Sequence, residues 1–216
     1  MLLYYITDRK GLGEADDGQR SALLRRIGEA ARAGVDYIQL REKDLSPRDL
    51  ERLAREALAE VRENSRTTRL LINERADVAL ACGADGVHLP AGQLSAFEVR
   101  ALWTKCCDRE PLIGVSAHSA AEVRVAKAQG ADLVVLAPIF EKVQTGTAGI
   151  GTDAIRQACS AGAEACVSGQ FAVLALGGVN LANARACLEA GAAGVAGIRL
   201  FQRGDLQQTV RQLRDL

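Results

Sequence analysis

Eight short apolar segments alternate with longer amphipathic segments along the 216 residues of this chain. The apolar segments are predicted to be β-strands over Leu2–Thr7, Tyr37–Arg41, Leu70–Asn73, Gly86–Leu89, Ile113–His118, Leu133–Pro138, Ala172–Gly177 and Gly194–Leu200. Helices are predicted between them over Ser21–Ala33, Pro47–Glu63, Ala96–Cys106, Ala120–Gln129, Asp153–Ala163, Leu181–Ala190 and Leu206–Leu216. Eight alternating units with no linker favour a closed barrel over an open sheet. The sequence therefore predicts an α/β fold, a single (β/α)8 TIM barrel over residues 1–216.

Four similar turns precede predicted strands and resemble an internal repeat. They lie at Ala33–Asp36, Cys82–Gly86, Gln129–Asp132 and Ala190–Gly194, and each contains a glycine that ends a helix. Such a glycine is expected in the left-handed conformation, where a side chain would be strained. These turns mark the stable end of the barrel. Functional side chains are therefore expected at the other end, where the strands finish.

Composition excludes several classes of partner. Basic and acidic residues number 27 each, so the formal net charge is zero, and neither nucleic acid nor an anionic membrane is expected as a partner. No Cys-x-x-Cys pair occurs and only two histidines are present, so a zinc site is not expected. The six cysteines are expected to be reduced. The chain starts directly on a strand-like segment and lacks a run of ~18 apolar residues, which predicts a soluble, cytoplasmic protein.

The end of the second predicted strand carries an amide and two cations. Gln39, Arg41 and Lys43 lie two residues apart, so on an extended chain their side chains share one face. Unpaired cations do not fit against the apolar helix layer, so this face is expected to line the mouth of the barrel. There it would suit a phosphate group. The alternative is a structural salt-bridge cluster with Glu42 or Asp44.

The third predicted strand ends on Asn73 and Glu74. These residues would either hydrogen-bond a substrate and hold a hydrated magnesium ion, or simply open the next helix, and residue types alone leave both interpretations equal. The two histidines, His88 and His118, both lie near predicted strand ends and are candidate general acids or bases. Ser116 lies two residues before His118, which favours His118 over His88. A buried structural histidine is the alternative for either.

Glycines follow the seventh and eighth predicted strands, where barrels commonly bind phosphate. Gly177, Gly178 and Gly197 would let backbone N–H groups approach such an anion, with a plain tight turn as the alternative. Residues 141–152 are polar and rich in glycine. They would form either a loop that closes over a substrate or an ordinary flexible loop.

Six short motifs, in order over nearly the whole chain, resemble the thiamine phosphate synthase and TenI superfamily. They are Gln39–Lys43, Leu71–Leu80, Gly83–Leu89, Ile113–Ser119, Ala137–Phe140 and Ala175–Val179. The resemblance implies an enzyme of thiamine biosynthesis. The synthase of this superfamily joins a hydroxymethylpyrimidine diphosphate to a thiazole phosphate, with Mg2+, through a short-lived pyrimidine cation. Family positions that contact the diphosphate match Gln39, Arg41, Lys43, Asn73 and Ser116, and those around the thiazole phosphate match Gly178, Gly197 and Ile198.

Departures from the synthase pattern favour the other branch. Glu74 replaces an aspartate and could still bind metal, whereas the neutral Gln93 stands where a second aspartate is usual, which would weaken a magnesium site. Residues 142–145 replace a Thr-x-Thr-Lys loop, and Arg199 replaces a serine. The turn at Pro90–Leu94 instead resembles the TenI branch, whose thiazole tautomerases need no metal.

The favoured prediction is therefore a TenI-like thiazole tautomerase that acts on a phosphorylated thiazole. In that enzyme His118 would move the proton, Arg41 or Lys43 would hold the carboxylate, and glycines including Gly177 would hold the phosphate. The alternative is a thiamine phosphate synthase, which would also bind the pyrimidine diphosphate, with Mg2+ at Glu74. A third possibility is a non-catalytic phosphate-binding regulator. The resemblance also implies a homodimer as an assembly to test.

Overall fold

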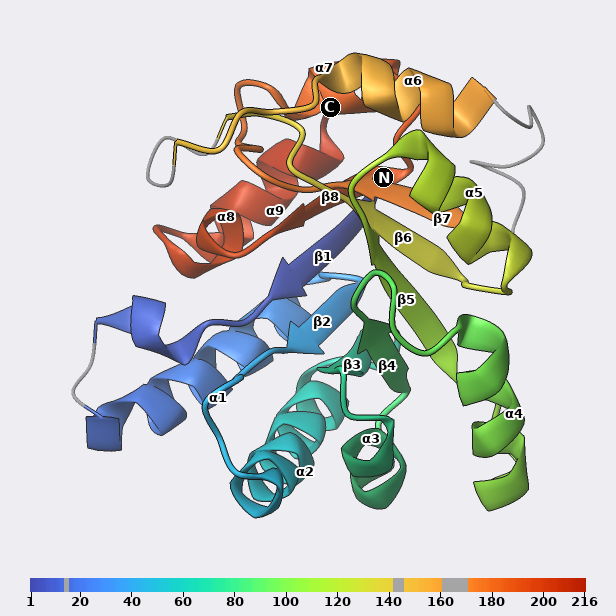
Figure 1. The fold of residues 1–216 in the computed structure, drawn as a ribbon. Helices are drawn as coiled ribbons and strands as arrows, with labels where there is room; N and C mark the ends of the chain where they lie inside the picture. The colour runs from blue at the N-terminus through green and yellow to red at the C-terminus, as the bar shows by residue number, and fades with distance from the viewer. Residues whose placement is uncertain (14–15, 142–145, 161–170) are drawn as a thin grey trace.

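Eight parallel strands form a closed barrel in which each strand pairs with its neighbours in chain order and β8 pairs with β1 (Figure 1). The computed structural model describes residues 1–13, 16–141, 146–160 and 171–216. The strands are β1 Leu2–Ile6, β2 Tyr37–Leu40, β3 Arg69–Asn73, β4 Gly86–Leu89, β5 Leu112–Ala117, β6 Leu133–Leu136, β7 Ala172–Ala175 and β8 Gly194–Gly197. The predicted (β/α)8 barrel is thus confirmed.

The helices lie around the outside of the strands, as Figure 1 shows. They are η1 Arg9–Leu12, α1 Asp16–Ala33, α2 Pro47–Asn64, α3 Ala76–Cys82, α4 Ala96–Cys106, α5 Ala120–Ala128, α6 Thr152–Ser160, α7 Ala184–Glu189, α8 Arg199–Gln202 and α9 Leu206–Arg214. Apolar side chains of these helices and of the outer strand faces form the two larger hydrophobic clusters. A smaller cluster, with Tyr4, Leu133, Val135 and Leu174, fills the barrel interior.

Several predicted boundaries were wrong. The second strand stops at Leu40, so Arg41 lies in the loop that follows it. The eighth strand stops at Gly197, and Arg199 begins the four-residue helix α8 rather than continuing the strand. Helix α3 was not predicted because its seven residues are too few to show a clear 3.6-residue period. The predicted end of α6, residues 161–163, falls outside the described residues.

The predicted role of the repeated glycines is confirmed. Gly34, Gly83, Gly130 and Gly191 have φ angles of 87°, 75°, 83° and 103°, so each turns the chain from a helix toward the next strand in the left-handed conformation. For Gly34, Gly83 and Gly130 nothing lies within 4 Å of the place a side chain would occupy. Backbone conformation, and not crowding, is therefore what requires glycine at these three turns.

An aspartate after three of these turns ties neighbouring strands together at the stable end. The carboxylates of Asp36, Asp85 and Asp132 accept hydrogen bonds from backbone N–H groups of the preceding strands, at 2.7, 2.8 and 2.7 Å. Each of the three carboxylates also forms an ion pair with an arginine. Arg214 pairs with Asp36 and Arg100 pairs with Asp132, and Asp85 has an arginine partner as well. The fourth turn has Ala193 in place of the aspartate. The hydrogen bonds and ion pairs of these carboxylates thus connect neighbouring strands at this end of the barrel.

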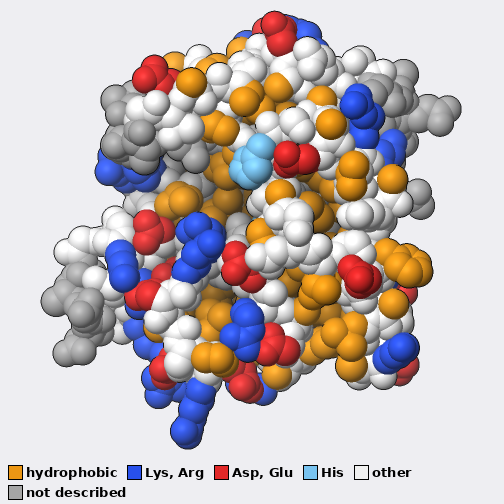
Figure 2. Space-filling view, viewed as in Figure 1, with side chains coloured by type: hydrophobic (Ala, Val, Ile, Leu, Met, Phe, Trp, Pro, Cys, Tyr) orange, Lys and Arg blue, Asp and Glu red, His pale blue; other side chains and the backbone are white. Residues whose placement is uncertain are grey.

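The molecular surface agrees with the balanced composition. On the face in Figure 2, lysine and arginine side chains lie among acidic ones rather than in one basic patch. None of the described helices combines the length and apolar character needed to cross a membrane. No disulfide joins two of the described cysteines, and Cys166 lies outside the described residues.

Candidate active site

The mouth of the barrel begins with two hydrogen-bonded amides, one buried and one half-buried. Gln39, at 2 % exposed, donates from Nε2 to Oδ1 of Asn73 at 2.8 Å, across the β2–β3 pair. This contact fixes which atom of each amide remains available. The Oε1 atom of Gln39 and the Nδ2 group of Asn73 take no part in this contact, so the pair can offer an accepting amide oxygen and a donating NH2 group to other partners. The structure thus brings together two of the residues that the sequence predicted for this site.

Arg41 is held at the mouth by its backbone. Its N–H donates to Oγ1 of Thr7 at 2.9 Å, and that hydroxyl donates onward to the buried carboxylate of Glu42 at 2.6 Å. Within the described residues, the half-buried guanidinium itself makes no ion pair or hydrogen bond. A fork of five N–H donors beside other polar groups suits an anion with several oxygens.

The salt-bridge cluster considered as the alternative for this strand exists, but with different cations. Arg9 pairs with Glu42 at 3.0 Å and with Asp44 at 2.6 Å, and Lys10 adds a contact to Asp44 at 2.9 Å. These contacts hold the pKa of Asp44 well below its usual range, chiefly through the hydrogen bond from Arg9. Because Arg9 and Lys10 neutralise both carboxylates, Arg41 stays uncommitted.

Lys43 does not join Arg41 as a free cation. It is exposed and pairs with Glu74 at 3.2 Å. Glu74 has a φ of 63°, in the left-handed region that disfavours residues other than glycine, so the backbone holds this side chain in a strained turn. Of the two cations predicted after this strand, Lys43 is therefore exposed and balanced by Glu74, whereas the guanidinium of Arg41 has no ion pair among the described residues.

His88 is the buried structural histidine of the pair. It is 2 % exposed, and its ring nitrogens contact the Tyr4 hydroxyl and the Ser116 hydroxyl, each at 3.0 Å. Burial, followed by the nearby charge of Arg41, lowers the pKa of His88 to about 3. A group that stays neutral at physiological pH is a poor general acid, so His88 does not fill that role.

His118 lies past the end of β5 and is exposed. Its Nδ1 lies 2.9 Å from the carbonyl oxygen of Ala137, and since a carbonyl only accepts, Nδ1 carries the proton. Its backbone N–H donates to Glu122 at 2.8 Å, which fixes the position of the residue. The free lone pair is therefore on Nε2. This geometry leaves His118 able to accept a proton.

Glycines at the ends of β7 and β8 allow close packing as well as an open backbone. Gly177 and Gly178 have φ angles of 93° and 66°. A side chain at Gly177 would lie 2.7 Å from Cα of Pro138, and one at Gly178 would lie 2.7 Å from Cβ of Phe140. The turn therefore needs glycine at both positions whether or not it binds phosphate. Gly197 ends β8, and Ile198 is the residue that precedes α8.

A family model described as thiamine monophosphate synthase matches residues 3–201. The chain belongs to this family. A putative thiamine-phosphate synthase from Geobacter sulfurreducens is 40% identical over 196 residues, which cover 90% of this chain and 83% of the relative. Putative thiamine-phosphate synthase 2 of Aquifex aeolicus is 36% identical over 200 residues, 92% of this chain and 96% of the relative. Thiamine phosphate pyrophosphorylase from Pyrococcus furiosus superposes with a TM-score of 0.78 at 27% identity, covering 99% of this chain and 94% of that one.

In this member of the thiamine monophosphate synthase family, three residues that the sequence did not single out contact the residues of the candidate site. Thr7 and Arg9 position the loop that carries Arg41, and Tyr4 contacts His88. Thr7 could have been found from the sequence, because it is a polar residue directly after the first apolar strand. Tyr4 gave none, since an aromatic residue within an apolar strand is ordinarily core.

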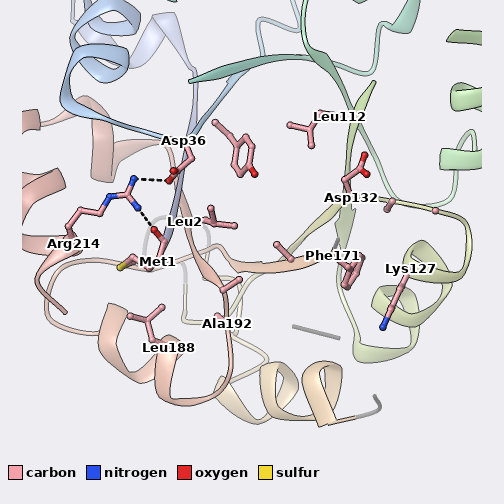
Figure 3. A pocket seen from close by; sticks show the side chains of 15 residues that line it. Met1, Leu2, Asp36, Leu112, Lys127, Asp132, Phe171, Leu188, Ala192 and Arg214 are labelled. Carbon is pink, nitrogen blue, oxygen red and sulfur yellow. Dashed lines mark hydrogen bonds and ion pairs between the residues drawn. The ribbon is translucent and has the colours of Figure 1, made fainter. Parts of the chain in front are cut away.

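A large pocket of about 1160 Å3 lies at the opposite, stable end of the barrel and not at the mouth. Figure 3 shows Asp36, Asp132, Lys127 and Phe171 on its walls, with Arg214 held by Asp36. The aspartates here are occupied by backbone N–H groups and by arginines. The large pocket is therefore lined by groups that already have partners, and the mouth of the barrel remains the candidate active site.

Proposed function

We propose that the chain is a thiamine-phosphate synthase, which joins a hydroxymethylpyrimidine diphosphate to a thiazole phosphate and releases diphosphate. The observation that carries this proposal is the guanidinium of Arg41, which makes no ion pair or hydrogen bond among the described residues. It follows β2 at the end of the barrel that also carries the Gln39–Asn73 pair and Ser116, and its charge acts on His88, the partner of Ser116. The named relatives support the synthase, which was the alternative interpretation of the sequence, better than the tautomerase that the sequence favoured.

The proposed reaction breaks the bond between the pyrimidine methylene carbon and the diphosphate oxygen. The bonding electrons leave with diphosphate, and the thiazole nitrogen then donates its lone pair to the carbon. Arg41 would stabilise the negative charge that develops on the departing oxygens, because its half-buried guanidinium is partly shielded from water and its backbone is held by Thr7. Asn73 and Ser116 would add hydrogen bonds to the same group. The backbone at Gly178 and Gly197 would hold the thiazole phosphate.

The residues present do not by themselves form a magnesium site. Among the described residues, no group of three or more histidine, cysteine, aspartate and glutamate side chains is placed to hold a metal. Glu74 is one carboxylate and already pairs with Lys43, and Gln93 is neutral and exposed. Mg2+ usually binds one or two carboxylates together with substrate phosphates.

The assay that tests the proposal supplies both synthase substrates to the purified protein, with Mg2+ and with a chelator in parallel. We expect thiamine phosphate and diphosphate to accumulate in equal amounts in at least one condition. Binding of the thiazole phosphate without condensation in either condition would contradict the synthase and favour a regulator. Conversion of a thiazole carboxylate phosphate to its tautomer, without condensation, would restore the favoured sequence interpretation.

Replacement of His118 by asparagine separates the two enzyme functions. Asparagine keeps an N–H near the position of Nδ1 for the Ala137 carbonyl but removes Nε2, the atom with the free lone pair. If the chain is a synthase, we expect kcat/KM for condensation to change less than about tenfold, because no proton transfer by this residue is required. Loss of a general base usually reduces a rate by about 10²–10⁴-fold, so a tautomerase would be nearly inactivated. Product formation is followed chromatographically for both reactions.

A further inference from the structure

A chain of three hydrogen-bonded side chains crosses the interior of the barrel. His88 and Ser116 lie on the neighbouring strands β4 and β5, whereas Tyr4 lies on β1, 84 residues before His88. The Tyr4 hydroxyl lies 3.0 Å from His88 Nδ1, and Ser116 Oγ lies 3.0 Å from His88 Nε2. Tyr4 is fully buried and His88 is 2 % exposed, whereas Ser116 is partly open at the end of β5.

Gly114 leaves the room that the imidazole of His88 needs. It is the β5 partner of His88 in the strand register. A side chain at Gly114 would lie 2.6 Å from Nδ1 of His88 and 3.0 Å from Leu133. The ring therefore lies over a position without a side chain, between Tyr4 on one side and Ser116 on the other. Its orientation is set by packing and by both of its hydrogen bonds.

The protons in the hydrogen bonds between Tyr4, His88 and Ser116 can be assigned by asking which acceptor each donor has. A neutral imidazole carries one N–H. Burial and the nearby positive charge of Arg41 keep His88 neutral. If Nδ1 carried the proton, Tyr4 would accept it, and the Tyr4 proton would be buried with no acceptor among the described residues. Buried donors are rarely left unpaired. Tyr4 therefore donates to Nδ1, and Nε2–H of His88 donates to Ser116.

Ser116 then has its own proton to give. Its oxygen accepts from His88, and no second partner for its hydroxyl exists within the described residues. We propose that His88 is a positioning residue: with its tautomer fixed by Tyr4, it turns the Ser116 hydroxyl into a donor for an anionic phosphate oxygen at the mouth. This inference rests on the proposed function, in which a diphosphate occupies this side of the mouth.

The tautomers can be observed directly by nitrogen-15 NMR of imidazole-labelled protein. The chain has only two histidines, and the His118→Asn variant identifies the signals of His88. We expect His88 with the proton on Nε2 and His118 with the proton on Nδ1, so the two rings show opposite patterns. The pattern of His88 should persist from pH 6 to 9, since burial lowers the pKa of His88 to about 3. A proton on Nδ1 of His88 would overturn the proposal.

Binding of inorganic diphosphate tests the consequence. Loss of one hydrogen bond to a charged group weakens binding about tenfold or more, so we expect that effect from Ser116→Ala and from His88→Phe. The double variant should bind no more weakly than Ser116→Ala alone, because both changes remove one donor. His88→Gln, whose amide can still donate to Ser116, should retain most of the affinity. Additive losses, or no rescue by glutamine, would overturn the positioning role.

The same variants separate this inference from the proposed function. Circular dichroism tests whether each variant is folded. If His88→Phe does not fold, the affinity of His88→Gln and the tautomer spectra still test the positioning role of His88. A wild-type chain that shows the expected tautomers and diphosphate binding but forms no thiamine phosphate would disprove the synthase alone. A chain that condenses both substrates, with an unchanged KM for the pyrimidine diphosphate in Ser116→Ala, would disprove the role of His88 alone.

Discussion

Replacement of Arg41 by glutamine is expected to reduce kcat/KM for thiamine phosphate formation by about 10²–10³-fold. The guanidinium is half-buried and uncommitted, and its backbone is fixed through Thr7 and Glu42. Glutamine can hydrogen-bond but carries no charge, so the departing diphosphate would lose the positive charge of Arg41. Steady-state kinetics with both substrates varied measures the effect. We expect most of the loss in kcat, because the charge on the oxygens grows as the bond breaks.

Lys43 supplies the matched control for Arg41. It lies two residues away and carries the same charge, but it is exposed and paired with Glu74. Exposed ion pairs contribute only about 0–1 kcal/mol, so Lys43→Gln should reduce kcat/KM less than about tenfold. Arg41→Lys should fall between the two glutamine variants, since it keeps the charge without the planar fork. Equal losses for the Arg41 and Lys43 variants would show that the mouth acts through its net charge and not through one placed guanidinium.

The fold could be predicted from the sequence because its signals are local. Each strand is a short apolar segment, and each glycine that ends a helix before a strand has a conformation that other residues adopt only with strain. Strand ends were less accurate. Arg41 and Arg199 both follow apolar segments, and nothing local shows that one begins a loop and the other a helix.

The site could be predicted only in part, because partners depend on contacts across the barrel. Lys43 and Arg41 look alike in the sequence, yet Glu74 on the next loop pairs with one of them alone. His88 and His118 also look alike. Tyr4, 84 residues away along the chain, is what makes His88 a buried part of the interior. Pairings of this kind require the register of distant strands, which the motifs do not contain.

Replacement of Gly86 by alanine is expected to have the largest effect on stability. Gly86 begins β4 and pairs with Leu112 of β5. An added side chain would lie 1.8 Å from the carbonyl oxygen of Leu112 and 2.6 Å from its carbonyl carbon. Backbone atoms in a closed barrel cannot move aside as a side chain can, so relief requires opening the β4–β5 pair. We expect the free energy of unfolding to fall by about 4 kcal/mol or more, and Tm to fall by about 10 °C or more.

Gly83→Ala, three residues earlier, is the control for this change. Gly83 has a φ of 75° but nothing within 4 Å of the added side chain, so only backbone strain opposes alanine. That strain costs about 1–2 kcal/mol, which corresponds to a Tm lower by roughly 2–8 °C. Gly194 begins β8 as Gly86 begins β4, and its added side chain would lie 1.9 Å from the carbonyl oxygen of Leu2. Gly194→Ala should therefore behave like Gly86→Ala. If thermal and urea unfolding instead place Gly86→Ala within the range of Gly83→Ala, the strands at this point lie farther apart than the barrel described here requires.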